Sequence, residues 1–159
     1  MCRLPIEKKV QIIQLLVEGN SLRSTSRIAD VSINAVTRLL IKVGLACANY
    51  HNKIVKNLHC KRVECDEIWS FVYSKQKNTP IENKKAGDIW TWVAIDPDTK
   101  LVISWLVGRR DEHAADLFVR DLSNRVDGYL QITTDGFKPY LGAIEKYFDG
   151  RAAYAQLLK

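Results

Sequence analysis

The first 44 residues have apolar positions spaced for helices. Between residues 5 and 17, apolar side chains recur at steps of three and four with polar side chains between them, which predicts one amphipathic helix. Ser21 can cap a second helix that ends at Asp30, and Ser32 can cap a third helix that ends at Gly44. The pattern therefore predicts three short helices, with a compact turn between the second and the third.

The pattern changes to that of strands at residue 63. Segments rich in β-branched and aromatic side chains are predicted strands, at residues 63–73, 88–95 and 101–107. A turn of Asp and Pro residues at 96–99 joins the last two into a hairpin. The segments that follow are a helix, a short strand, a second helix and a last strand or helix, at residues 111–126, 129–133, about 138–147 and 151–158. Residues 63–159 are therefore predicted to form a mixed α/β domain.

Residues 45–62 have weak periodicity and several basic side chains, which predicts a basic linker containing a short helix at residues 50–57. Thiol and imidazole groups gather in and after this segment, at Cys47, His51, His59, Cys60 and Cys65. A zinc site is one interpretation. Isolated thiols are the favoured one, because the paired spacing of zinc knuckles is absent.

Charge separates the two parts of the chain. Residues 1–62 carry a net charge of +8 and residues 63–159 a net charge of −2. A strongly basic segment beside a mildly acidic, aromatic-rich one indicates a nucleic-acid-binding unit attached to a module with its own carboxylate chemistry, and a solvated basic face is the alternative. No apolar run approaches the roughly 20 residues that cross a bilayer, and no secretory signal opens the chain, so a cytoplasmic protein is expected.

The basic part fits a helix-turn-helix unit at residues 1–44, in which the third helix enters the major groove. The alternative is a three-helix bundle that binds no DNA or forms dimers. Expected contacts to bases and phosphates come from the second and third helices, at Arg23, Arg27, Ser32, Asn34, Thr37 and Arg38.

In the α/β part, two aspartates lie in or directly after predicted strands, where an unpaired carboxylate is costly. Asp66 lies inside the first predicted strand, and Asp135 follows the fourth. The order of elements is that of the first part of a ribonuclease H-like fold, in which these two strands are neighbours, so the two carboxylates should converge. Hard oxygen ligands of this kind hold Mg²⁺ or Mn²⁺ for phosphoryl transfer. The alternative is that Asp135 caps the next helix and Asp66 pairs with a lysine.

Other charged residues receive weaker expectations. Glu67 alternates to the opposite face of its strand and should not share the site. Glu112 or Asp116 could supply a further acid, although acids are favoured in a first helical turn anyway. Cations expected along a DNA path are Lys84, Lys85, Arg109 and Arg110, and solvated loop charge is an equally good interpretation of them.

Three segments carry a resemblance to a known family: CDEIWSFV, GDIWTWVAIDPDTKLVISWLVGRRDE and LQITTDGFKPYLGAI. They resemble the catalytic core of bacterial insertion-sequence transposases of the DDE type, and are most similar to the insertion sequence one family. The resemblance covers residues 63–159 nearly continuously. It implies Mg²⁺-dependent cutting and joining of DNA at terminal inverted repeats and target DNA, by an oligomer on the bacterial nucleoid, with Asp66 and Asp135 as the first two acids.

The sequence also departs from the family pattern. Members have a third acid, a Glu on a helix beyond the last core strand, and Lys159 precedes any such helix. They also usually have a Cys-rich zinc segment ahead of the helix-turn-helix, of which only Cys2 could remain. A C-terminally truncated transposase is therefore expected, and a catalytically inactive DNA-binding repressor of transposition is the alternative function.

Overall fold

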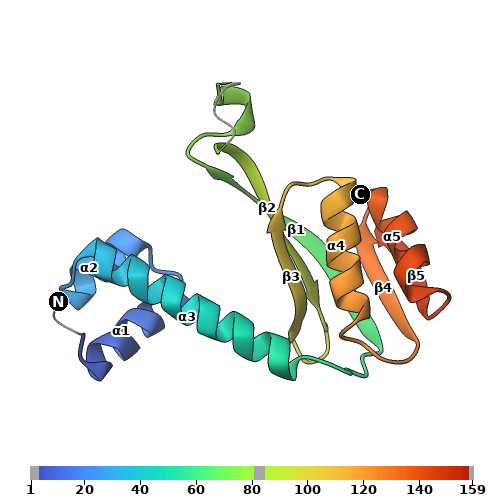
Figure 1. Cartoon of the computed structure of the whole chain (residues 1–159), viewed down its shortest axis with the longest axis horizontal. Helices are drawn as coiled ribbons and strands as arrows, with labels where there is room; N and C mark the ends of the chain where they lie inside the picture. Colours follow the sequence, from blue (N-terminus) through green and yellow to red (C-terminus); the bar gives the residue numbers. More distant parts are fainter. Residues whose placement is uncertain (1–3, 81–84, 158–159) are drawn as a thin grey trace. The chain divides into compact units, whose positions relative to one another are not determined.

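The computed structural model describes residues 4–80 and 85–157 and separates the chain into two compact units, Met1–Ile54 and Val55–Lys159. Figure 1 shows the helical first unit and the sheet of the second. Lys84, expected on a DNA path, lies outside the described residues. No single helix in the described ranges is long and apolar enough to cross a membrane, although the helices Leu22–Ala29 and Ile33–Ile54 together reach that length and hydropathy.

The first unit contains α1 (Ile6–Val17), α2 (Leu22–Ala29) and α3 (Ile33–Ile54). Ile12, Ala29 and Val36 are fully buried where the helices meet. The predicted caps are confirmed, since the hydroxyl oxygens of Ser21 and Ser32 accept the amides of Ser24 at 3.1 Å and Ala35 at 3.2 Å. The chain bends by 113° between α2 and α3. This angle lies within the range of about 90–120° typical of helix-turn-helix pairs.

The prediction that the third helix ends at Gly44 is wrong, because α3 continues to Ile54 and takes in more than half of the expected linker. A glycine ends a helix by adopting a left-handed conformation, and Gly44 does not have the positive φ that this requires. The segment after Gly44 is rich in helix formers such as Leu45, Ala46 and Ala48, so one glycine does not stop the helix.

Gly44→Ala is expected to raise the free energy of unfolding of the first unit by about 1 kcal/mol, because glycine loses more backbone entropy than alanine in a helix interior. A Cβ at Gly44 would meet nothing within 4 Å. Urea unfolding followed by circular dichroism measures the change. Ala46→Gly, at an exposed position of the same helix, should lower stability by a similar amount. A destabilising Gly44→Ala would contradict the helical assignment.

The second unit is built on one five-stranded mixed sheet in the order β3-β2-β1-β4-β5. Its strands are β1 (Arg62–Val72), β2 (Gly87–Ile95), β3 (Val102–Gly108), β4 (Leu130–Asp135) and β5 (Ala152–Leu157). The first three strands pair antiparallel, while β4 runs parallel to β1 and β5 runs parallel to β4. The expected neighbourhood of the first and fourth strands in a ribonuclease H-like fold is thereby confirmed, and the last segment is a strand.

Two helices, α4 (Glu112–Ser123) and α5 (Pro139–Phe148), pack on one face of this sheet (Figure 1). The core between them is aromatic, with Trp92, Phe118, Tyr140 and Phe148 almost completely buried. The alternation along β1 turns Val63 and Cys65 into this core. The opposite face of the antiparallel strands exposes large apolar side chains, including Ile68, Trp105 and Val107.

The turn between β2 and β3 is organised by the buried carboxylate of Asp96. One oxygen accepts the hydroxyl of Thr99 at 2.7 Å, and the other accepts the amide of Asp98 at 2.9 Å. The hydrogen bond from Thr99, followed by that from Asp98, holds the pKa of Asp96 below its usual value. The predicted hairpin turn is confirmed, and its first acid is a structural one.

Asp96→Asn is expected to lower stability by about 1–2 kcal/mol at neutral pH and by less in acid. The lowered pKa of Asp96 means that its carboxylate stabilises the fold above the ordinary carboxyl pKa, and that this contribution disappears as pH falls through the lowered pKa. Urea unfolding between about pH 6 and pH 2 measures this. Asp98→Asn is the control, because Asp98 forms an exposed ion pair with Arg62. Equal pH profiles for both variants would refute the assignment.

Candidate acidic site

Asp66 and Asp135 come together where β1 and β4 run side by side. The parallel register pairs Glu64 with Thr133, and both aspartates lie two residues further along their strands, on the same face of the sheet. One carboxylate oxygen from each of Asp66, Glu67 and Asp135 lies within 4.8 Å of the others. These three residues are called the acid group below.

The expectation that Glu67 stays outside this group is wrong. Its Cβ does alternate to the core face, as the pleat requires. However, the ladder between β1 and β4 ends at Glu64 and Thr133, so no backbone pairing closes that edge of β1 at Glu67. A glutamate side chain is long enough to turn its carboxylate toward the open edge. Strand alternation alone therefore gave the wrong conclusion.

Glu67 is the buried member of the acid group, with 1% of its side chain exposed. One carboxylate oxygen accepts the Arg110 Nε at 2.7 Å, and the other accepts a short hydrogen bond from the Tyr140 hydroxyl. Burial, the nearby Cys65 and this bond to Glu67 raise the pKa of Tyr140, so the hydroxyl remains a donor at ordinary pH. A buried charge of this kind requires such partners.

Arg110 connects two acids of the group. Its Nη2 donates to Asp135 at 2.7 Å, while its Nε donates to Glu67. The guanidinium also lies 4.1 Å from the centre of the Phe137 ring and 5.4 Å from that of Trp90. Burial lowers the pKa of Arg110, but the hydrogen bond and charge of Glu67 outweigh that effect and leave the pKa above its usual value. The sequence contained no signal that distinguishes Arg110 from its neighbour Arg109.

The acid group has the donor chemistry of a divalent-cation site. Its oxygens are hard ligands of the kind that Mg²⁺ and Mn²⁺ prefer. Asp66 is exposed and its Oδ1 accepts the amide of Glu67 at 2.9 Å, while Asp135 Oδ1 accepts the amide of Phe137 at 3.0 Å. The residues therefore fit such a cation, with the Arg110 guanidinium as the competing positive charge.

The zinc interpretation receives no support from the described residues. Cys47 is exposed on α3, whereas Cys65 is buried in the core of the second unit. Within residues 4–80 and 85–157, the one grouping of possible metal ligands contains neither Cys nor His. Cys47, Cys60 and Cys65 are free thiols, and isolated thiols stay the interpretation that the sequence favours.

The alternative acids on α4 do not belong to the acid group. Asp116 accepts Lys146 Nζ at 2.6 Å and the Tyr147 hydroxyl at 2.7 Å, and so links α4 to α5. These hydrogen bonds, that of Lys146 first, hold the pKa of Asp116 below its usual value. Glu112 is exposed in the first turn of α4, where the helix dipole favours an acid.

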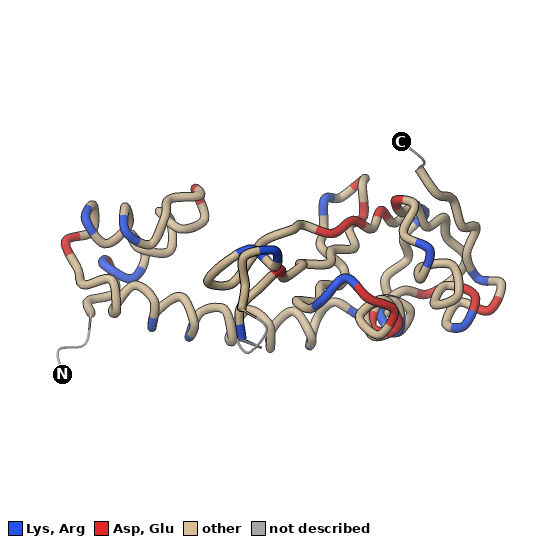
Figure 2. Tube along the Cα trace, turned by 90° about the horizontal axis from the view of Figure 1, so that it is seen from above, with Lys and Arg blue, Asp and Glu red and all other residues tan. Residues whose placement is uncertain are grey.

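The residues expected to contact DNA in the first unit are mostly on its surface. Arg23 and Arg27 are exposed on α2, and Asn34 and Arg38 are exposed on the first turns of α3. Figure 2 shows Lys and Arg positions along this unit with few acidic ones. Ser32 is exposed and caps α3, while the hydroxyl of Thr37 donates to the carbonyl of Ile33 at 2.9 Å. None of the three arginines forms an ion pair within the described ranges.

Basic side chains also lie beside the acid group in the second unit. Arg109 and Lys85 line a hollow of about 200 Å³ at the start of β2. An adjoining hollow of about 280 Å³ is lined by Gln76, Asp88, Trp90, Arg109 and Arg110. Because Arg110 lines the second hollow and also binds the acid group, that hollow and the group are neighbours.

Comparisons with known proteins give distant likenesses only. No protein-family model matches the sequence, and no curated protein is similar to it. Among solved structures, the Mos1 strand transfer complex is similar with a TM-score of 0.40 and 14% identity, over 99% of this chain and 60% of that one. A piggyBac transposase synaptic complex with hairpin DNA has a TM-score of 0.43 and 16% identity, over 92% and 29%. The chain thus spans less than two thirds of either neighbour, and the likenesses assign it no function.

Proposed function

We propose that this chain is a DDE-type transposase that binds DNA and cleaves and joins strands at the terminal repeats of an insertion sequence. The observation that supports this proposal is the acid group, in which Asp66 and Asp135 meet from adjacent parallel strands of a ribonuclease H-like sheet. Membership of the insertion sequence one family is included in the proposal, as the resemblance implies.

The acid group would hold Mg²⁺ or Mn²⁺ through Asp66 and Asp135, with Glu67 beside them. When bound, such a cation polarises a phosphoryl oxygen and makes water a better nucleophile at neutral pH. The chain's own residues prepare the site. Tyr140 donates a hydrogen bond to one oxygen of Glu67, and Arg110 neutralises Glu67 and Asp135. A bound cation would compete with Arg110 for these two acids, and a phosphate would compete with the acids for Arg110.

DNA binding is assigned to the first unit. Its bend of 113° between α2 and α3, the exposed start of α3 and the basic charge of this part of the chain all fit insertion of α3 into the major groove. Asn34 and Arg38 would read base edges, and Arg23 and Arg27 would hold phosphates. Because phosphate neutralisation releases counterions, binding should weaken steeply with salt.

We further propose that the chain acts as an oligomer on the bacterial nucleoid.

A second function is supported by a specific observation. Arg110 engages two of the three acids, which leaves only the exposed Asp66 without an arginine partner. A chain in this state would occupy terminal repeats without cutting them and would act as a repressor of transposition.

Cleavage tests the proposal directly. Labelled duplexes taken from the DNA that flanks the coding sequence are incubated with the full chain, with Mg²⁺, with Mn²⁺ or with EDTA. Metal-dependent nicking at one position is expected of a transposase. Binding without nicking would identify the repressor, and absence of both would reject the two functions together.

A further inference from the structure

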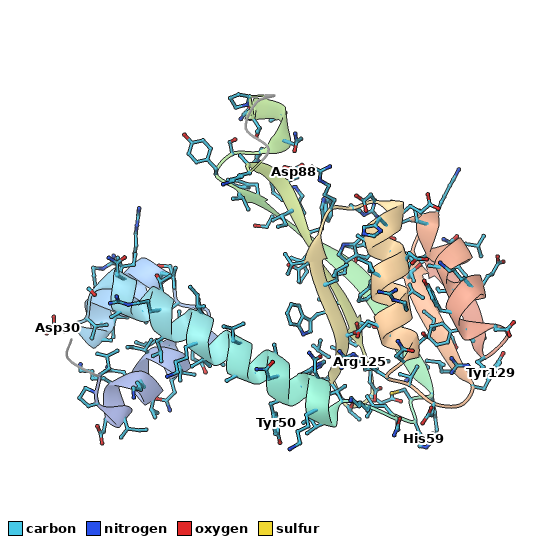
Figure 3. All side chains as sticks on the ribbon, in the orientation of Figure 1. Asp30, Tyr50, His59, Asp88, Arg125 and Tyr129 are labelled. Carbon is cyan, nitrogen blue, oxygen red and sulfur yellow. The ribbon has the colours of Figure 1, made fainter. Side chains whose placement is uncertain are left out.

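The hairpin formed by the far ends of β1 and β2 extends beyond the rest of the sheet. β3 pairs with β2 only as far as Trp90 and Gly108, so the hairpin beyond this point is a two-stranded ribbon that leads to η1 (Gln76–Asn78). Figure 1 shows it leaving the sheet away from α4 and α5, and Figure 3 labels Asp88 upon it. This ribbon, residues 69–80 and 85–90, is called the arm.

One face of the arm is aromatic, and it continues the face of β1 that carries Glu67. The alternation places Trp69 and Phe71 on the same side as Glu67, and their cross-strand partners are Trp90 and Asp88. The Trp69 and Phe71 rings lie 5.8 Å apart, centre to centre. Cross-strand aromatic pairing stabilises a ribbon, yet Trp69 remains 40% exposed and Phe71 44% exposed. These rings are therefore available to a ligand.

Cations accompany the aromatic rings. Lys75 Nζ lies 5.1 Å from the centre of the Trp69 ring. Arg109 and Lys85 line one hollow on the arm, and Arg109 also lines the adjoining hollow. Arg110, whose guanidinium lies over the Trp90 ring, lines that second hollow and binds the acid group. The acid among them, Asp88, accepts the amide of Gln76 at 2.9 Å and so holds η1 against β2. The arm thus presents flat apolar rings and positive charge together.

We propose that the arm binds unpaired nucleotides of a DNA strand, next to the phosphodiester that the acid group acts on. Bases stack on Trp69 and Phe71, while phosphates pair with Lys75, Lys85 and Arg109. In a duplex, each base is already stacked between its neighbours, so a protein ring can stack only on a base at a strand end or on a base that has been extruded. The location of the phosphodiester rests on the proposed function, whereas the stacking surface rests on the arm alone.

Stacking is tested with the full chain in EDTA, which prevents cleavage. The probe is a thymidine oligomer of about 12 nucleotides with a central 2-aminopurine, whose fluorescence falls when the base stacks. Quenching and binding are expected with the unchanged chain. Trp69→Ala and Phe71→Ala should each weaken binding about tenfold and reduce the quenching. Trp69→Phe, which keeps a ring, should retain both.

Trp105→Ala is the matched control, because Trp105 is a similarly exposed tryptophan, 47% exposed, on the opposite face of the sheet. It should leave binding unchanged. Equal affinity and quenching in Trp69→Ala, Phe71→Ala and Trp105→Ala would overturn the proposal. The proposal would also be overturned if Trp69→Ala abolished self-association of the protein and left binding of the thymidine probe unchanged. That result would identify a second copy of the chain as the occupant of the arm.

The two proposals fail separately. If the acid group does not cut DNA, the metal-dependent nicking assay is negative, while quenching of the 2-aminopurine fluorescence still depends on Trp69. If the arm does not stack bases, quenching is independent of Trp69 and Phe71 while nicking still depends on Asp66.

Discussion

Asp66→Asn and Asp135→Asn should each reduce metal-dependent DNA cleavage by about a thousandfold or more while leaving DNA binding unchanged. Each substitution removes a charged ligand from the acid group and keeps the shape of the side chain. Metal assistance supplies several kcal/mol of transition-state stabilisation, and about 1.4 kcal/mol corresponds to a tenfold change in rate. Gel assays of nicking and of complex formation on the same labelled duplex measure the two effects.

Glu64→Gln is the matched control for these variants. Glu64 is an exposed acid on the same strand and the same face as Asp66, and it lies outside the acid group. Its replacement removes one negative charge and should leave cleavage within a factor of about two, as expected for a surface position. Cleavage that survives either aspartate substitution would exclude the assigned site.

Arg110→Ala should lower the free energy of unfolding by about 2–4 kcal/mol in EDTA, because it leaves the buried Glu67 charge without its cation. The same variant should bind Mn²⁺ more tightly than the unchanged chain, since the guanidinium no longer competes for Glu67 and Asp135. Binding of the ion to the folded state then restores part of the lost stability. Urea unfolding with and without Mn²⁺, together with calorimetric titration of the ion, measures both effects.

Arg109→Ala controls for the loss of a positive charge at the neighbouring position. The Arg109 side chain is exposed, while its carbonyl accepts the Trp92 indole N–H at 3.1 Å whatever the side chain is. Its stability should change by no more than about 0.5 kcal/mol, and its Mn²⁺ affinity should stay the same. An Arg110→Ala variant with unchanged Mn²⁺ affinity would reject competition between arginine and metal.

Signals in the sequence predicted the starts of two helices, the hairpin of the second and third strands, and the adjacency of the first and fourth strands. Ser21 and Ser32 mark helix starts because a hydroxyl that bonds a free amide is a property of a few neighbouring residues. The adjacency of the first and fourth strands followed from the order of elements and is present in the sheet. The proximity of Asp66 and Asp135 could therefore be predicted from the sequence.

What the sequence did not reveal depends on competition or on distant contacts. The end of α3 was misplaced because Gly44 opposes the helix less strongly than residues 45–54 favour it. Glu67 was misplaced because the point where a ladder ends is a tertiary property. Arg110 reaches its two acids from the end of β3, and no local pattern separates it from Arg109.

The short ladder between β1 and β4 has a consequence for the order of folding. Three register pairs join the two strands, and β2, β3 and α4 lie between them along the chain. The antiparallel hairpins need only local loop closure, whereas β4 must return across α4 before it can pair, and such long-range pairing forms slowly. A nascent chain that has formed only its hairpins holds Asp66 without Asp135, so the acid group is incomplete until β4 has paired with β1.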